Sequence, residues 1–162
     1  MNPPEPRHPE EQPEALPTRT GADGTLQVFD NLRQRWVAFT PEEEVRQLFV
    51  RYLCRTMGYP AGRLGNEVPL VQHGRRRRCD TVVYGPDAKP VAIVEYKAPQ
   101  VAVNRSVFEQ IMRYALALES VKYIFVSNGR RNYCARLERD GEQKLQFLDR
   151  LPAYHELLQQ AY

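Results

Sequence analysis

The chain has 162 residues, of which 42% are hydrophobic and 27% are charged, and its formal net charge is +3. This composition is typical of a soluble globular domain, and no apolar stretch reaches the ~18–20 residues that a membrane span requires. The three cysteines lie far apart in the sequence, which argues against a zinc site and a disulfide framework. We therefore expect a reduced, cytoplasmic setting and no membrane partner.

The N-terminal segment, residues 1–24, holds six of the thirteen prolines and almost no large apolar residues. Such a segment cannot bury enough surface to offset its ordering entropy, so we expect a disordered tail. It also lacks the apolar core of a signal peptide. The remaining residues, 25–162, are expected to form a single domain.

The first predicted elements are a hairpin and a helix. Residues 26–39 contain two β-rich runs that flank a turn-forming Asp-Asn pair. A helix then begins at Thr40, with Thr40 as the N-cap, Pro41 at the first helical position and Glu43 at the capping-box position. Apolar residues at helical spacing define its buried face, namely Val45, Leu48, Phe49, Tyr52 and Leu53.

The middle of the chain is predicted to be β-structure. A strand over Glu67–Val71 leads into a basic turn from His73 to Arg78. Two further strands, Asp80–Tyr84 and Val91–Lys97, flank a turn rich in glycine and proline.

The last part of the chain alternates helices and strands. We expect a helix over residues 106–119, a buried strand over 123–127, an edge strand over 132–137 and a short helix over 154–161. The predicted fold is therefore α/β, with a small mixed β-sheet flanked by helices and a core in the order α-β-β-β-α-β.

Two of these strands bring acidic residues together. Side chains alternate faces along a strand, so Glu95 and Lys97 point to the same side. The simplest antiparallel pairing sets Tyr84 opposite Val91 and therefore Asp80 opposite Glu95. Directly opposed residues have Cβ atoms ~4.5–5.5 Å apart, so two carboxylates would meet on one face with an ammonium group beyond them.

A divalent cation would remove the repulsion between these carboxylates. Mg²⁺ usually takes one or two carboxylates and completes its shell with water and substrate phosphate. We predict that Asp80 and Glu95 bind Mg²⁺ or Mn²⁺ and that Lys97 assists the attacking water or the charge growing on phosphorus. The alternative is three solvated charges at strand ends; the apolar residues before Glu95 and the register of Asp80 favour the metal site.

Asp80 and the run Glu95-Tyr96-Lys97 belong to a wider pattern. Its other segments are Thr40-Pro41-Glu42-Glu43, Val45-Arg46-Gln47, Tyr59-Pro60, Arg78-Cys79, Gln110-Ile-Met-Arg-Tyr114 and Asn128-Gly129. Through these segments, over about residues 28–135, the sequence resembles the PD-(D/E)XK nuclease superfamily. More narrowly, it resembles the nuclease domain at the N-terminus of the restriction subunit of type I restriction enzymes, with Cys79 in place of the eponymous proline. The resemblance implies a restriction-endonuclease-like fold.

Further site residues are expected on the two longer helices. Gln110 and Tyr114 lie one helical turn apart, and the resemblance implies that such a pair borders the metal site; the alternative is that Tyr114 is core and Gln110 pairs with backbone. The first helix should supply another acid, and helical phase favours Glu42 over Glu43, which the capping box explains, and over Glu44. Outside the helices, Glu67 could orient metal ligands or be a solvated strand end.

A basic run precedes Asp80 directly, made of Arg75, Arg76, Arg77 and Arg78. So dense a cluster near a metal site would attract phosphates and make binding salt-dependent. The alternative is a solvated basic loop.

These expectations combine into a metal-dependent endonuclease acting on DNA, in restriction or other DNA processing. The alternative is a non-catalytic accessory subunit that grips DNA while a partner cuts or translocates. The length departs from the resemblance, since no motor domain follows in these 162 residues. Cutting both strands needs two sites, so the expected protein partner is a second copy of the chain, or else a separate motor or specificity subunit.

Overall fold

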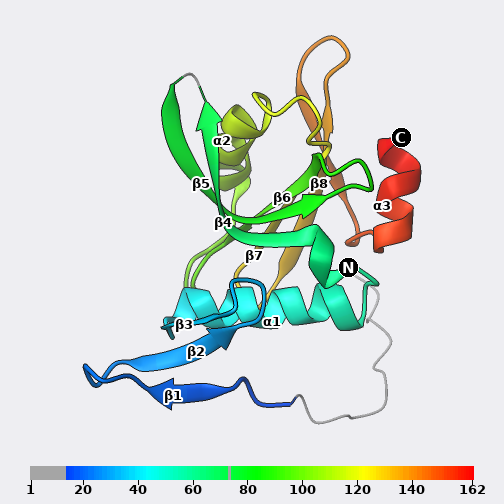
Figure 1. The fold of residues 1–162 in the computed structure, drawn as a ribbon. Coiled ribbons are helices and arrows are strands. Elements are labelled where there is room, and N and C mark those ends of the chain that lie inside the picture. The colour runs from blue at the N-terminus through cyan, green and yellow to red at the C-terminus, as the bar shows by residue number, and fades with distance from the viewer. Residues whose placement is uncertain (1–13, 73) are drawn as a thin grey trace.

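The computed structural model describes residues 14–72 and 74–162, which form two β-sheets and three α-helices (Figure 1). Most of the predicted tail, residues 1–13, lies outside the described residues. The predicted disorder does not extend over the rest of it, because Thr18–Thr20 form strand β1, which pairs with residues 26–28. None of the helices in the described part of the chain is long and apolar enough to cross a membrane.

The smaller sheet contains β1, β2 (Leu26–Asp30) and β3 (Arg35–Ala38) in antiparallel order. The β2–β3 pair is the hairpin that the sequence predicted. Strand β1 was not predicted because Thr-Arg-Thr has no apolar alternation; all three residues are exposed, and pairing with β2 holds them extended.

Helix α1 (Pro41–Arg55) lies between the small sheet and the large one (Figure 1). Its start is as predicted, since Thr40 Oγ1 accepts a hydrogen bond from the Glu43 backbone N–H at 3.1 Å. The capping box is not completed, because the Glu43 carboxylate accepts hydrogen bonds from Arg33 and Gln47 instead. The predicted buried face holds except at Leu48, which is 42% exposed.

The large sheet has six strands in the order β4 (Leu64–Gln72), β5 (Arg75–Tyr84), β6 (Pro90–Tyr96), β7 (Tyr123–Ser127), β8 (Asn132–Glu138) and β9 (Lys144–Leu148). All neighbours are antiparallel except β6 and β7. A parallel pair needs a crossover connection, and α2 (Arg105–Ala115) provides it. The predicted mixed sheet is therefore confirmed.

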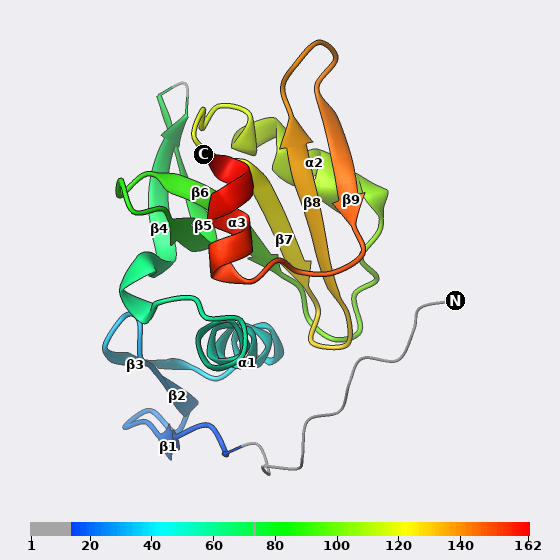
Figure 2. The same ribbon diagram turned by 90° about the vertical axis from the view of Figure 1, so that its right-hand side faces the viewer.

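Helices cover both faces of the large sheet (Figure 2). Helices α1 and α3 (Tyr154–Ala161) pack on one face around Phe49, Tyr96 and Phe125, and α2 packs on the other around Ile93 and Ile111. A 3₁₀ turn (Ala61–Arg63) joins α1 to β4. The core order α1-β4-β5-β6-α2-β7 is the predicted α-β-β-β-α-β order.

Several predicted boundaries were wrong. Residues Arg75–Arg78 belong to β5 and not to a turn, because they pair with residues 69–72 of β4. Strand β8 is not an edge strand, because β9 pairs with it. Helix α2 ends at Ala115 instead of residue 119. Tyr84 stands opposite Pro90 and not Val91, because the ladder shifts register between Val83 and Tyr84.

Candidate active site

Asp80 on β5 and Glu95 on β6 stand at neighbouring positions of two paired strands. The ladder sets Val82 opposite Ile93 and Thr81 opposite Val94, so the next step places Asp80 across from Glu95. The side chains of Asp80 and Glu95 are 19% and 23% exposed. Two carboxylates therefore face one region of the sheet from which solvent is largely, but not wholly, removed.

The Asp80 carboxylate is held at both oxygens. Its Oδ2 accepts a hydrogen bond from the Tyr96 backbone N–H at 2.9 Å, and its Oδ1 lies 3.5 Å from Arg46 Nη2. Burial and the negative charge of Glu95 raise the pKa of Asp80 to about 7, although the Tyr96 N–H and Arg46 act in the opposite direction. Burial, the largest of these causes, disfavours the ionised carboxylate, and an opposite charge close by would favour it.

Glu95 is also held at both oxygens. Lys97 Nζ lies 3.0 Å from its Oε1, and the Tyr114 hydroxyl donates a hydrogen bond to its Oε2 at 3.3 Å. Lys97 follows β6, and its backbone N–H bonds to the Ser127 carbonyl at 2.9 Å. This bond extends the strand by one pleat, so that the ammonium group and Glu95 share a side.

Helix α2 contributes Tyr114 but not Gln110 to these contacts. Burial and the charge of Glu95 raise the pKa of Tyr114, so its phenol remains a hydrogen-bond donor at neutral pH. The Arg77 guanidinium lies 5.9 Å from the Tyr114 ring centroid, within cation–π range. Gln110 is exposed, and within the described residues it makes no hydrogen bond to Glu95 or Lys97.

The acids of α1 differ in their surroundings. Glu42 and Glu44 are exposed, and the charge of Glu42 adds to the rise in the pKa of Asp80. Glu43 is buried and accepts hydrogen bonds at 2.8 Å from both Arg33 and Gln47. Glu42 is therefore an acid within electrostatic reach of Asp80, whereas Glu43 is engaged in the interior.

Arg46 is a buried cation at the centre of this region to which sequence analysis assigned no role. Its side chain is only 4% exposed, and its Nη2 lies 2.7 Å from Glu67 Oε1 and 3.5 Å from Asp80 Oδ1. Burial by itself would lower the pKa of Arg46, but Glu43, Asp80 and Glu67 outweigh it and raise the pKa. The available signal was its place next to Val45, a residue of the predicted buried face of the helix.

The four arginines of β5 are all exposed and run directly towards Asp80. Because a strand alternates faces, Arg75 and Arg77 point to one side and Arg76 and Arg78 to the other. Arg77 reaches Tyr114, and Arg78 Nη1 lies 3.3 Å from Glu67 Oε2. Arg77 and Arg78 therefore contact residues that border the two carboxylates.

The donor set fits a hard divalent cation. Among residues 14–72 and 74–162, no group of three or more histidine, cysteine, aspartate or glutamate side chains is arranged to hold a metal. A pair of carboxylates is nevertheless sufficient for Mg²⁺, which usually keeps several waters and takes one or two protein carboxylates. Asp80 and Glu95 form such a pair, and both carboxylates stay partly open to solvent.

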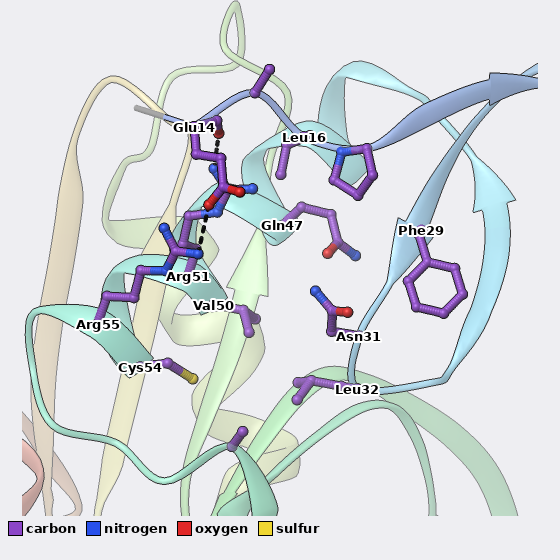
Figure 3. A pocket seen from close by; sticks show the side chains of 13 residues that line it. Glu14, Leu16, Phe29, Asn31, Leu32, Gln47, Val50, Arg51, Cys54 and Arg55 are labelled. Atoms are coloured by element: carbon purple, nitrogen blue, oxygen red, sulfur yellow. Dashed lines mark hydrogen bonds and ion pairs between the residues drawn. The ribbon is translucent and has the colours of Figure 1, made fainter. Parts of the chain in front are cut away.

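A separate cavity of about 370 Å³ lies on the other side of α1, beside β2 and residues 14–17 (Figure 3). It is lined mainly by apolar side chains such as Leu16, Phe29 and Val50, and Glu14 pairs with Arg55 at its rim at 2.9 Å. None of the predicted site residues lines it. The carboxylate pair is therefore not part of this cavity.

The family described as type I restriction enzyme R protein N terminus (HSDR_N) matches residues 41–152. The chain belongs to this family. No curated protein matches the chain. Among solved structures, a fragment assigned to an HsdR subunit of a type I restriction enzyme from Vibrio vulnificus YJ016 is similar over 80% of this chain, with 19% identity and a TM-score of 0.52.

The likeness to that HsdR fragment shows the fold, which is restriction-endonuclease-like. This chain spans 25% of the length of the HsdR fragment. The HSDR_N match runs from the first residue of α1 to the residues just before α3, so Asp80, Glu95 and Lys97 all lie within it. The small sheet, β1 to β3, precedes the matched residues.

Proposed function

We propose that this HSDR_N domain is a Mg²⁺- or Mn²⁺-dependent endonuclease that acts on DNA. The observation that carries the proposal is the position of Asp80 and Glu95, each one step beyond the Thr81–Val94 pair of the β5–β6 ladder, with Lys97 Nζ 3.0 Å from the Glu95 carboxylate. Family membership supports it, because the matched residues include all three side chains.

Each side chain has a role that follows from its contacts. Asp80 and Glu95 hold the metal, and the Tyr96 N–H and the Tyr114 hydroxyl fix the orientation of these carboxylates. The ion, when bound, polarises a phosphoryl oxygen and acidifies a water molecule. Lys97 places its ammonium group beside that water or the charge that develops on phosphorus. Glu42 reaches the site from α1, and Gln110 contacts the substrate from α2.

The exposed arginines Arg75–Arg78 bind the phosphates of the substrate. Their positive charge lies on the strand that leads into Asp80, so a backbone bound there continues towards the carboxylates. Neutralised phosphates release counterions, which makes such binding strongly salt-dependent.

The domain acts within a type I restriction system, where a separate motor or specificity subunit delivers DNA, or as a homodimer that cuts both strands. Two cuts need two sites, and a two-fold dimer supplies them. Sedimentation of the purified protein with and without DNA distinguishes a homodimer from a monomer that depends on other subunits.

The direct test is cleavage of linear, circular and single-stranded DNA by purified protein in Mg²⁺, Mn²⁺ or EDTA. We expect nicked or shortened products in metal and none in EDTA. If the DNA stays uncut in both Mg²⁺ and Mn²⁺ while the wild-type protein is folded and bound to it, the proposed endonuclease activity is refuted.

That outcome would favour the second candidate, a DNA-gripping accessory domain. The observation behind it is that Arg46 and Lys97 already lie beside the two carboxylates, while four arginines remain exposed. In that case binding in EDTA would equal binding in Mg²⁺, and the Asp80→Asn variant would bind DNA as the wild type does.

A further inference from the structure

Arg46 is an unusual residue to bury. Its side chain is 4% exposed, and within the described residues its Nε and Nη1 atoms have no hydrogen-bond partner. One nitrogen, Nη2, is shared between Glu67 at 2.7 Å and Asp80 at 3.5 Å, while Nη1 lies 3.4 Å from Glu43 Oε2 without hydrogen-bond geometry. A buried arginine normally gains most from a two-pronged pair with one carboxylate, so sharing one nitrogen between two acids is a poorer arrangement for the arginine itself.

Glu67 is unusual in its backbone. It has a φ of +53° inside strand β4, a left-handed conformation that a glutamate rarely adopts. The ladder pairs Asn66 with Thr81 and Val68 with Cys79, so Glu67 stands across from Asp80. Strained residues of this kind persist where the surrounding structure over-determines them, and they cluster at functional sites.

These two irregularities meet at one contact. The Glu67 carboxylate lies 2.7 Å from Arg46 Nη2, whereas the Asp80 carboxylate lies 3.5 Å from the same atom. Glu43 adds a third acid, with its Oε2 3.4 Å from Nη1. The guanidinium is thus drawn towards Glu67 and Glu43, and it touches only one oxygen of Asp80.

We propose that Arg46 and Glu67 are positioning residues for the carboxylate pair, in which Glu67 holds Arg46 away from Asp80 so that Arg46 orients Asp80 without capturing it. The inference rests on the proposed metal-dependent function and names two residues beyond it. Asp80 then keeps one oxygen on the Tyr96 N–H and its remaining lone pairs available to a cation. Without Glu67, the freed Arg46 closes on Asp80 as a two-pronged ion pair that competes with the metal.

The two positions therefore have opposite effects on metal binding. Glu67→Gln should weaken binding of Mn²⁺ or Mg²⁺ about tenfold, the scale typical of residues that orient metal ligands. Arg46→Met should leave metal affinity unchanged or tighter, because a competing cation is gone, yet lower cleavage at saturating metal by about tenfold or more. A residue that only supports the fold would not separate affinity from turnover in this way.

A double-mutant cycle shows whether Glu67 acts through Arg46. In the Arg46→Met background, Glu67→Gln should no longer weaken metal binding, because the competing guanidinium is absent. If Glu67 acts only by its own negative charge, the weakening persists in that background. Glu138→Gln is the matched control, since it removes one acid of an arginine pair, Glu138–Arg136 at 3.4 Å, on β8.

The readouts are calorimetric titration of the DNA-free protein with Mn²⁺ and Mg²⁺, and single-turnover cleavage at saturating metal. A wild type that neither binds metal nor cleaves overturns the proposed function itself. If the wild type both binds metal and cleaves, two results overturn this inference alone. One is that Glu67→Gln has the same metal affinity as Glu138→Gln. The other is that Arg46→Met weakens metal binding as much as Glu67→Gln does. Should Arg46→Met fail to fold, Arg46→Lys, which keeps the charge but not the planar fork, must lose turnover while metal affinity stays within about threefold of wild type.

Discussion

Replacing Lys97 with alanine separates an endonuclease from a DNA-gripping domain. The Lys97 and Glu95 side chains are 29% and 23% exposed and their charged atoms lie 3.0 Å apart, so water screens the pair. Such a pair contributes no more than about 1 kcal/mol to folding, and the melting temperature should change by only a few degrees. In the transition state, loss of one preorganised donor typically costs about 2.7–4 kcal/mol, or roughly a hundredfold to a thousandfold in rate.

The assay is single-turnover cleavage of a labelled duplex and of its single strand. Wild type, Lys97→Ala and a control, Lys89→Ala, are compared; Lys89 is exposed and precedes β6, at the other end of the strand. We expect Lys97→Ala to be slower by on the order of a hundredfold, with metal affinity retained or slightly increased because a cation has been removed. Equal rates for Lys97→Ala and wild type, or cleavage that persists in EDTA, would show that Lys97 is not catalytic.

Three other changes test the remaining parts of the structure. Millimolar Mg²⁺ or Mn²⁺ should raise the melting temperature, because a ligand of the folded state alone stabilises it, and Asp80→Asn should abolish the rise; a variant that keeps it excludes Asp80 as a ligand. Replacing Arg75–Arg78 with alanine should flatten the log–log salt slope of duplex binding by roughly two to four, and an unchanged slope would mean a solvated ribbon. Burial alone would raise the pKa of Asp30, but hydrogen bonds from Asn66 and Arg33 outweigh it, so the pKa is lowered and the ionised form stabilises the fold. That contribution is complete above the unfolded pKa of about 3.9 and is lost as pH falls through the lower folded value. Asp30→Asn should therefore cost about 3–5 kcal/mol near pH 7, with a deficit that shrinks below about pH 4 in thermal melts, and a deficit independent of pH would contradict the linkage.

Sequence signals were sufficient to predict the elements whose structure depends mainly on residues close together in the chain. Thr40 and Pro41 fix the start of α1, and the apolar run Tyr123–Ser127 coincides with β7. The sequence predicted a basic turn that includes Arg75–Arg78, but pairing with β4 holds these residues extended. That pairing is non-local, so charge along the chain could not reveal it. The register shift between Val83 and Tyr84 is different, because it lies opposite Pro90, a residue visible in the sequence that has no N–H to give to the ladder.

The same distinction applies to the candidate site. Asp80, Glu95 and Lys97 could be placed from two strands and the short connection between them. Arg46 could not, because its acidic partners on β4 and β5 meet it only when α1 packs against the sheet. A lone arginine on a mostly buried helix face is a signal that a charged partner lies across the interface, but it does not say which one.

A buried polar chain connects the small sheet to the large one. Asp30 on β2 accepts a hydrogen bond from Asn66 Nδ2 at 3.0 Å, and Asn66 Oδ1 accepts one from Thr81 Oγ1 at 2.6 Å. Thr81 Oγ1 in turn accepts a hydrogen bond from the Tyr96 hydroxyl at 2.9 Å. Asp30 and Thr81 are completely buried, so every bond in the chain forms at low local dielectric, where it is strong and costly to break.

Each member of this chain on the large sheet is the sequence neighbour of a site residue. Asn66 precedes Glu67, Thr81 follows Asp80, and Tyr96 follows Glu95. Because successive strand residues face opposite sides, the network holds β5 and β6 from behind while Asp80 and Glu95 project towards the site. On β4 it holds Asn66, the residue before the left-handed Glu67. Without a bound cation Asp80 and Glu95 repel one another, and the hydrogen-bonded network behind them keeps their carboxylates from moving apart. The small sheet, which precedes the matched family residues, therefore supports the proposed metal site through Asp30.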